Sequence, residues 1–314
     1  MTAIPSTASR PLPAAAGEVL EGLYQHRLLS ATQVRALHAP HASLRWTQQL
    51  LRSLAEHALI EAVRVGRGAH KLYFITAAGA DAVEQVPTRV ETRRKLITPA
   101  QALGPLRAHT LAVNDVGIAF LRAAQERGDE CGPFAWRHEV AHPIGALPGR
   151  RRSELLICDA VLHYLLYGPD EELTFHYRFL ELDRGTIPVD ELGAKLARYA
   201  RLHRFTPDPT AAQAGPERPA WEGHYPVFPD VLCVLASQPR SRLERRLRTT
   251  INLCRTDPLL QGESAVQVWL CLLDDLLADG PFAPILVSHR QPTQLVDWLG
   301  ATGSPTSPPQ RPGA

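Results

Sequence analysis

The chain has 314 residues, of which 45% are hydrophobic and 21% charged, with a formal net charge of +2. This length is enough for about two domains, and the composition excludes a disordered or fibrous chain. The five cysteines are scattered without a C-x-x-C pair, so neither a zinc ribbon nor a disulfide framework is expected. The N-terminus lacks the apolar core of a signal peptide and no apolar run is long enough to span a bilayer, so we expect a cytoplasmic protein without membrane contact.

Positive charge is concentrated in the N-terminal third of the chain. Residues 1–107 carry 13 Lys and Arg against 7 Asp and Glu, whereas the remainder carries 21 against 25. The basic part is therefore the better candidate for contact with nucleic-acid phosphates. Residues 1–15, which are proline-containing and rich in small side chains, are expected to be disordered.

The first elements have the order of a winged helix-turn-helix over residues 16–84. One helix is expected over 18–28, and Ser30 with Gln33 forms a capping box that opens a second. Ser43 caps a third helix, whose leucines face inward and whose polar side chains remain outward for phosphate or base edges. This recognition helix would contact DNA through Arg45, Gln48, Gln49 and Arg52.

A hairpin with a glycine-rich tip is expected over residues 60–75 and is typical of a wing. Its exposed basic residues are Arg64, Arg67 and Lys71. Thr76 then caps a short helix. The alternative is a winged helix that docks proteins, with these cations as a solvated face, but charge, helix order and wing together favour DNA.

Residues 85–108 are interpreted as a basic linker, because they contain three prolines with Arg89, Arg93, Arg94 and Lys95. Such a strip either follows a DNA backbone or is simply solvated. A helix over 109–125 is expected next, ahead of a sheet.

The segment His138-Glu139-Val140-Ala141-His142 matches the H-E-x-x-H signature of zinc proteases. That chemistry needs both histidines on one face of a helix, yet Pro143 follows directly and disfavours helical geometry. A strand over 134–140 is expected instead, with Glu139 as an additional acid beside Asp159. A zinc metalloprotease remains the less favoured alternative.

Acidic residues occur in two strand-like runs: Asp159 lies within 155–162, and Glu181 and Asp183 lie at the end of 175–183. Alternation along a strand places Glu181 and Asp183 on one face, and a neighbouring strand brings Asp159 close to them. Hard oxygen ligands of this kind suit Mg²⁺ or Mn²⁺, which activate water and neutralise charge on a phosphate. The sequence therefore predicts a metal site at Asp159 and Glu181, assisted by Asp183.

One lysine lies on the apolar face of the helix expected over 189–202, together with Tyr199. Only three lysines occur in the chain against 31 arginines, so an amine at Lys195 is informative. Lysine is a compact charge that orients water or a scissile phosphate in ways that a guanidinium does not. The alternative is a lysine whose stem covers apolar surface while its ammonium reaches solvent.

The C-terminal part alternates strands and helices, which supports an α/β sandwich over residues 109–300. A mobile loop is expected over 206–221 and a disordered tail over 301–314. A helix over 240–252 carries a second basic cluster, which either holds a substrate backbone or is a solvated face. The cluster consists of Arg242, Arg245, Arg246 and Arg248.

These acids and Lys195 resemble the PD-(D/E)xK, restriction-endonuclease-like superfamily, with two departures. Cys158 replaces the proline before Asp159, and Asp183 stands where the lysine of (D/E)xK is expected. In this superfamily the lysine migrates to a following helix, which matches Lys195. The departures keep open a catalytically inactive member that binds DNA or recruits replication or transfer proteins.

The whole chain resembles the replication-relaxation family of plasmid and mobile-element proteins. The matching segments are 50–60, 73–79, 109–121, 179–186, 195–199 and 225–234. This resemblance implies an N-terminal winged helix before an α/β/α nuclease-like sandwich, double-stranded DNA as the partner, and a role in plasmid replication and DNA relaxation. A Mg²⁺- or Mn²⁺-dependent DNA-nicking activity is the corresponding expectation.

Overall fold

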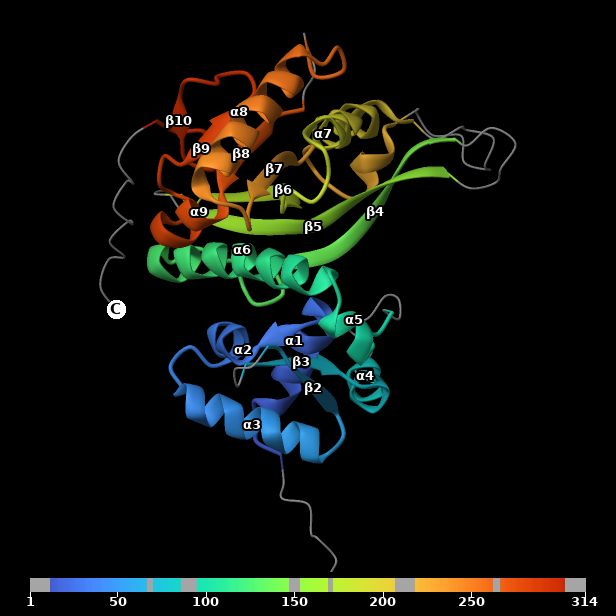
Figure 1. Ribbon diagram of the computed structural model, residues 1–314, viewed down its shortest axis with the longest axis vertical. Helices are drawn as coiled ribbons and strands as arrows, with labels where there is room; N and C mark the ends of the chain where they lie inside the picture. Colours follow the sequence, from blue (N-terminus) through green and yellow to red (C-terminus); the bar gives the residue numbers. More distant parts are fainter. Residues whose placement is uncertain are drawn as a thin grey trace, which may run out of the picture. The chain divides into compact units, whose positions relative to one another are not determined.

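The protein, seen in a computed structural model, divides into two compact units, residues 1–114 and 115–314 (Figure 1). The division falls within one helix, α6 (Leu106–Arg127), rather than before residue 109. The structure describes residues 12–66, 70–85, 95–146, 153–168, 172–206, 218–261 and 266–302. The tails expected to be disordered and the loop expected over 206–221 fall mostly outside these ranges.

The first unit contains a three-stranded antiparallel sheet with β3 between β1 and β2. Ser30, Ser43 and Thr76 each accept a hydrogen bond from the backbone amide three residues later, which starts α2, α3 and α4 at these residues. The helices and hairpin follow the order expected for a winged helix. In chain order the elements are α1 (Ala16–His26), β1 (Leu29–Ser30), α2 (Ala31–His38), α3 (Leu44–Glu56), β2 (Ile60–Arg64), β3 (Lys71–Ile75) and α4 (Ala77–Glu84).

The prediction of a basic linker over 85–108 is wrong for residues 95–108, which the structure describes. Thr98 and Gln101 form a capping box at the start of α5 (Pro99–Leu103). Ala102 is fully buried against the core of the first unit, where it joins Leu28 and Phe74. The segment therefore completes this core, whereas Arg89, Arg93 and Arg94 lie outside the described residues.

The second unit is built on a seven-stranded sheet with the order β10-β9-β8-β7-β6-β5-β4. Strands β4, β5 and β6 form an antiparallel meander, and β6, β7 and β8 run parallel, connected by α7 and α8. The elements after α6 are β4 (Trp136–Ala146), β5 (Ser153–Tyr167), β6 (Leu173–Asp183), α7 (Val189–Arg204), η1 (Ala220–Gly223), β7 (Asp230–Leu235), α8 (Arg240–Thr256), β8 (Val268–Leu272), α9 (Leu273–Asp279), β9 (Leu286–Ser288) and β10 (Leu295–Val296).

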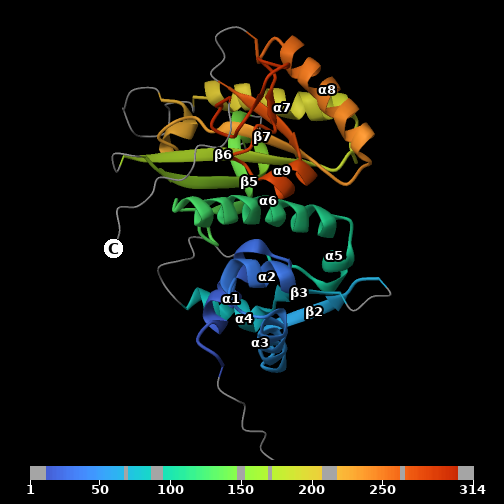
Figure 2. The same ribbon diagram turned by 90° about the vertical axis from the view of Figure 1, so that its left-hand side faces the viewer.

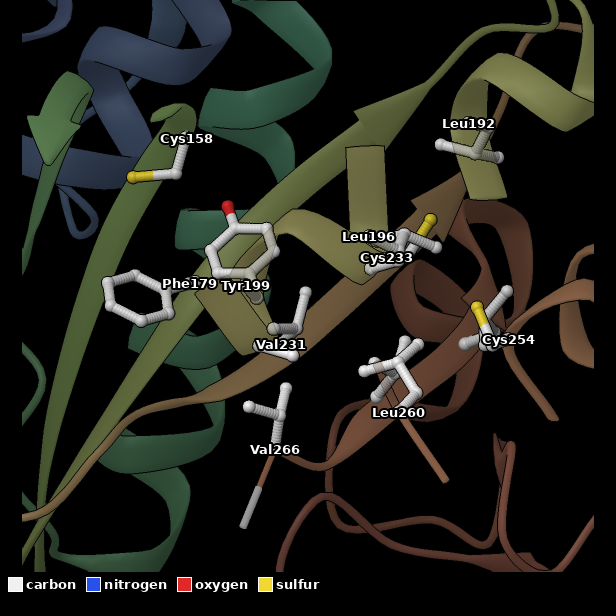
Figure 3. Close-up of a cluster of buried hydrophobic side chains, with 14 of the residues drawn as sticks. Cys158, Phe179, Leu192, Leu196, Tyr199, Val231, Cys233, Cys254, Leu260 and Val266 are labelled. Atoms are coloured by element: carbon white, nitrogen blue, oxygen red, sulfur yellow. The ribbon is translucent and has the colours of Figure 1, made fainter. Parts of the chain in front are cut away.

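Helices cover both faces of this sheet. Figures 1 and 2 show α7 and α8 side by side over one face and α6 along the other. The core under α7 and α8 includes Phe179 and Tyr199 (Figure 3). On the α6 face, the rings of Phe120, Tyr164 and Trp298 pack against one another. The second unit therefore has the α/β/α sandwich that the sequence predicts.

Two expectations about the class of protein concern cysteines and membrane spans. All five cysteines are buried free thiols, so no disulfide crosslinks them. Among the helices that the structure describes, none combines the length and apolar character needed to cross a bilayer.

Helix α6 approaches the sheet closely at Gly117. A Cβ atom at this position would lie 2.4 Å from the ring of Trp136, which is fully buried. Gly117→Ala is therefore expected to lower the free energy of unfolding by about 1–3 kcal/mol, because an overfilled core forces neighbouring side chains to shift. Thermal unfolding followed by circular dichroism measures the effect.

Gly17→Ala in α1 is the matched control for this substitution. A Cβ atom there meets no atom within 4 Å, and alanine favours a helix over glycine by up to about 1 kcal/mol. The two variants should therefore shift the unfolding temperature in opposite directions. An unchanged or raised unfolding temperature for Gly117→Ala would mean that α6 can move away from Trp136 without loss.

Candidate active site

The strands β4 and β5 exchange faces of the sheet beside Asp159. Regular alternation would keep Cys158 and Tyr164 on one face. Instead, Cys158 lies in the core under α7, whereas Tyr164 packs against Phe120 of α6. The β4–β5 ladder skips the pair formed by Glu139 and Asp159, and Glu139 has a φ of 53°. A local irregularity of this kind re-aims a side chain, here at the position of Asp159.

The neighbouring strands β5 and β6 separate at the same point. Their regular pairing ends at Ala160 opposite Leu180. Beyond it, the carboxylate of Asp159 replaces the missing backbone partner, because the amide of Leu182 donates a 2.7 Å hydrogen bond to its Oδ2. This contact leaves the other oxygen, Oδ1, to face the helix that follows β6.

Glu181 lies on the α7 side of β6, on the same face as the buried ring of Phe179. Its side chain is only 2% exposed. The hydroxyl of Tyr199 donates a 2.6 Å hydrogen bond to Oε1, and the ammonium of Lys195 donates to Oε2. Tyr199, a predicted site residue of lesser weight, therefore fixes one oxygen of this carboxylate.

Lys195 joins the two acids. Leu192, Leu196 and Tyr199 of α7 are buried, so the helix turns this face toward the sheet and carries the lysine with it. The Nζ atom of Lys195 contacts Glu181 and lies 3.5 Å from Oδ1 of Asp159. The interpretation of Lys195 as a residue that only covers apolar surface is therefore wrong, because its ammonium forms ion pairs with both carboxylates.

The electrostatics of this cluster raise the affinity of Glu181 for a proton. Burial, and then the negative charge of Asp159, raise the pKa of Glu181 to about 8, although Lys195 opposes the shift. Burial disfavours the ammonium of Lys195, but Glu181 and Asp159 outweigh it and raise the lysine pKa above its ordinary value. Burial, and then the charge of Glu181, hold the pKa of Tyr199 well above 10, so its hydroxyl remains a donor.

The raised pKa of Glu181 predicts a pH dependence of stability. The folded state binds this proton more tightly than the unfolded chain, so the contribution is complete below about pH 4 and is lost as pH rises through about 8. Glu181→Gln removes the titration. The unfolding temperature of this variant should therefore rise relative to wild type between about pH 5 and 8.5.

Thermal unfolding at constant ionic strength over this pH range checks the prediction. Glu191→Gln, which replaces an exposed glutamate of the same helix, is the control and should run parallel to wild type. Parallel curves for Glu181→Gln and wild type would show that Glu181 titrates as an ordinary carboxyl group.

Asp183 is placed differently from the expectation that it assists a metal ion. It shares a strand face with Glu181, but Arg246 of α8 pairs with both of its oxygens. The amide of Gly185 also donates a 3.1 Å hydrogen bond to Oδ1. The assignment of Asp183 as an assisting ligand is therefore corrected: its oxygens are committed to holding α8 and the β6–α7 turn.

The H-E-x-x-H segment lies on strand β4, not on a helix, which removes the metalloprotease alternative. His142 is buried against Phe179 and forms a 2.8 Å hydrogen bond with the hydroxyl of Tyr225. Burial lowers the pKa of His142 to about 4, so it is a neutral core residue at physiological pH. Glu139 is exposed at the face exchange opposite Asp159, as an acid beside the site rather than a base on a zinc helix.

The two acids fit a magnesium or manganese ion that has few protein ligands. One oxygen of each is held by Leu182 or Tyr199, and the other faces the ammonium of Lys195, so a single cation already lies against both carboxylates. Mg²⁺ commonly binds through one or two carboxylates and completes its shell with water and substrate phosphate. Within the described residues, no group of three or more His, Cys, Asp or Glu side chains is arranged around a common point.

The predicted DNA contacts of the first unit are exposed wherever they are described. Leu50, Leu51 and Leu54 of α3 are buried, and the opposite face of the helix is polar. The predicted contact residues that are exposed on this helix and hairpin are Arg45, Gln48, Gln49, Arg52, Arg64 and Lys71. Arg67, at the hairpin tip, lies outside the described residues.

The second unit is thus an α/β/α sandwich in which two carboxylates and a helix-borne lysine converge. A family model described as replication-relaxation matches residues 20–214. The chain belongs to the replication-relaxation family.

Comparison with solved structures finds similarity to the restriction endonuclease FokI. The sequence identity is 10% and the TM-score 0.27, over 85% of this chain and 43% of the FokI chain. This chain therefore spans less than half the length of that protein. No curated protein matches the sequence.

Proposed function

We propose that this protein nicks double-stranded DNA of plasmids or other mobile elements in a reaction that depends on Mg²⁺ or Mn²⁺. The observation that carries the proposal is the convergence of Asp159, Glu181 and Lys195 where β5 and β6 separate. Membership of the replication-relaxation family supports DNA as the substrate and replication or relaxation as the context. The cytoplasm is the corresponding compartment.

Each residue of the cluster has a separate role in this proposal. Asp159 and Glu181 would hold the ion, which when bound lowers the pKa of water and neutralises charge on a phosphate. Lys195, whose side chain is 29% exposed, would position water or the scissile phosphate. Tyr199 keeps Glu181 oriented, and Leu182 does the same for Asp159 through its amide.

The first unit would bring the protein to DNA as a winged helix. The polar face of α3 and the strands of the hairpin present cations and amides to solvent, which are the groups that contact phosphates and base edges. Arg45→Ala together with Arg52→Ala should therefore weaken DNA binding without changing the chemistry at Asp159 and Glu181.

Supercoiled plasmid incubated with the purified full chain and Mg²⁺ or Mn²⁺ tests the proposal. Wild type should yield relaxed circles on a gel, whereas Asp159→Ala and Glu181→Ala should not. Glu191→Gln, an exposed acid of α7 outside the cluster, should behave as wild type. Relaxation that persists in both alanine variants would contradict the assignment of this site.

A catalytically inactive DNA-binding or recruitment protein is the second candidate function. Two observations favour it: Cys158 stands where the motif has proline, and among the described residues no third His, Cys, Asp or Glu side chain joins the two acids in a metal-binding group. The sulfhydryl of Cys158 is buried and donates to the carbonyl of Val140, so it is a packing group. This candidate predicts salt-sensitive DNA affinity that is indifferent to Asp159→Ala, with no relaxed product from any form.

A further inference from the structure

Helix α8 concentrates positive charge in an otherwise acidic unit. Its 17 residues include six arginines and one glutamate, whereas residues 108–314 as a whole carry 21 basic and 25 acidic side chains. The helix is therefore strongly basic, whereas the unit around it carries a net negative charge.

Two of the six arginines have partners within the protein. Arg240 pairs with Glu244 and Asp275, and Arg246 pairs with Asp183. The other four are exposed, and no side-chain ion pair or hydrogen bond engages them within the described part of the chain. They are Arg242, Arg245, Arg248 and Arg255, called here the arginine row.

The arginine row follows one side of the helix. Successive turns of the helix carry Arg242, Arg245 and Arg248, which are three residues apart. The exposed amide of Asn252 follows four residues after Arg248, and Arg255 three residues after that. At 1.5 Å per residue, the row extends over about 20 Å. Duplex DNA carries a phosphate every 3.4 Å along each strand, so a row of this length matches several phosphates of one backbone.

The arginine row belongs to the helical layer that covers the face of the sheet on which Glu181 lies. Helices α7 and α8 lie side by side on one face of the sheet (Figure 2). α7 carries Lys195, and Arg246 attaches α8 to Asp183, two residues beyond Glu181 on the same strand. A DNA backbone bound along α8 would therefore lie on the same side of the sheet as Glu181 and Lys195.

We propose that the arginine row binds the sugar–phosphate backbone of duplex DNA beside the acidic cluster, as a contact separate from the winged helix. The inference rests on the proposed function for the choice of DNA. It favours a duplex because α8 contains no aromatic residue, and single strands are held largely by stacking of bases on aromatic rings. Guanidinium groups contact phosphates without regard to sequence, so this contact holds substrate rather than selecting it.

The test measures binding of a labelled duplex of arbitrary sequence by the full chain in EDTA, over a series of salt concentrations. Replacing all four arginines of the row by glutamine should weaken binding about tenfold or more and reduce the salt slope by roughly 0.9 for each phosphate that is no longer neutralised. Replacing the same four by lysine should retain most of the slope, because the charge remains. Arg122→Gln, an exposed arginine of α6 on the opposite face of the sheet, should bind as wild type.

Single glutamine variants keep the test decisive if the fourfold variant does not fold, since each should lower the slope by roughly 0.9. Wild-type affinity and slope in these variants would overturn the inference and leave the row as a solvated face or a site for an acidic protein. A larger loss of affinity for a single-stranded oligonucleotide than for the duplex would overturn the choice of duplex.

The two proposals fail in distinguishable ways. Because binding is measured without divalent ions, it does not depend on cleavage. If wild type never nicks plasmid but the glutamine variants lose duplex affinity, the nuclease proposal fails and the DNA-binding role of the arginine row stands. If wild type nicks and the variants bind normally, only the proposal for α8 fails.

Discussion

Lys195→Met is expected to reduce nicking of supercoiled plasmid by roughly 100- to 1000-fold, because removal of one preorganised hydrogen-bond donor from an active site costs about that much. The ammonium contacts Glu181 and lies 3.5 Å from Asp159, so its loss also leaves Glu181 without its cation. DNA binding should stay within about twofold of wild type, since the substitution removes one cation at most from the surface that faces phosphate. Initial rates of plasmid relaxation and duplex affinity, measured on the same preparation, separate the two effects.

Two further variants define the requirement for an amine at this position. Lys195→Arg keeps the charge but presents a planar guanidinium, and should recover only a small part of the activity. Arg204→Met removes an exposed cation from the last turn of the same helix and should leave the rate unchanged. Wild-type rates in Lys195→Met would exclude the lysine from the reaction and favour an arrangement in which it only balances charge.

Arg246→Met is expected to lower the free energy of unfolding of the second unit by about 3–5 kcal/mol, because it leaves the buried carboxylate of Asp183 without a counterion. The Asp183 side chain is 2% exposed, and its oxygens accept from Arg246 and Gly185. Urea denaturation followed by tryptophan fluorescence measures the loss of stability. Four of the five tryptophans, all but Trp46, belong to the second unit, so the signal reports mainly on it.

The matched variant for this prediction removes both charges together. Arg246→Met with Asp183→Leu should recover much of the lost stability, because a buried ion pair replaced by apolar side chains is often neutral. A double variant as unstable as Arg246→Met alone would mean that the pair has another function. Metal-dependent activity that survives in the double variant would show directly that Asp183 is not a ligand.

The acidic cluster follows largely from local patterns in the sequence. Alternation along β6 places Glu181 on the face that α7 covers, and the apolar spacing of α7 turns Lys195 toward it. The structure brings both to Asp159, although their role in catalysis stays a proposal. The partner of Asp183 had no such signal, since Arg246 is 63 residues away in sequence and one of several arginines on its helix.

The sequence contains a signal for helix α5 but none for the face exchange of β4 and β5. Thr98-Pro99-Ala100-Gln101 combines a capping box with proline at the first helical position, which is enough to predict α5 in place of a linker. The face exchange of β4 and β5 had no comparable signal. Its positive φ falls on Glu139, not on a glycine, so no residue type favouring that conformation marks the position.

The gap between β5 and β6 makes one backbone amide a reporter of the cluster. Leu182 donates its N–H to the side chain of Asp159 instead of to a backbone carbonyl of β5. Hydrogen–deuterium exchange at this amide therefore depends on whether that carboxylate is present, ionised and in place. A single peptide-bond proton, in a strand that is otherwise paired with β7, would respond to events at the acids without any label introduced there.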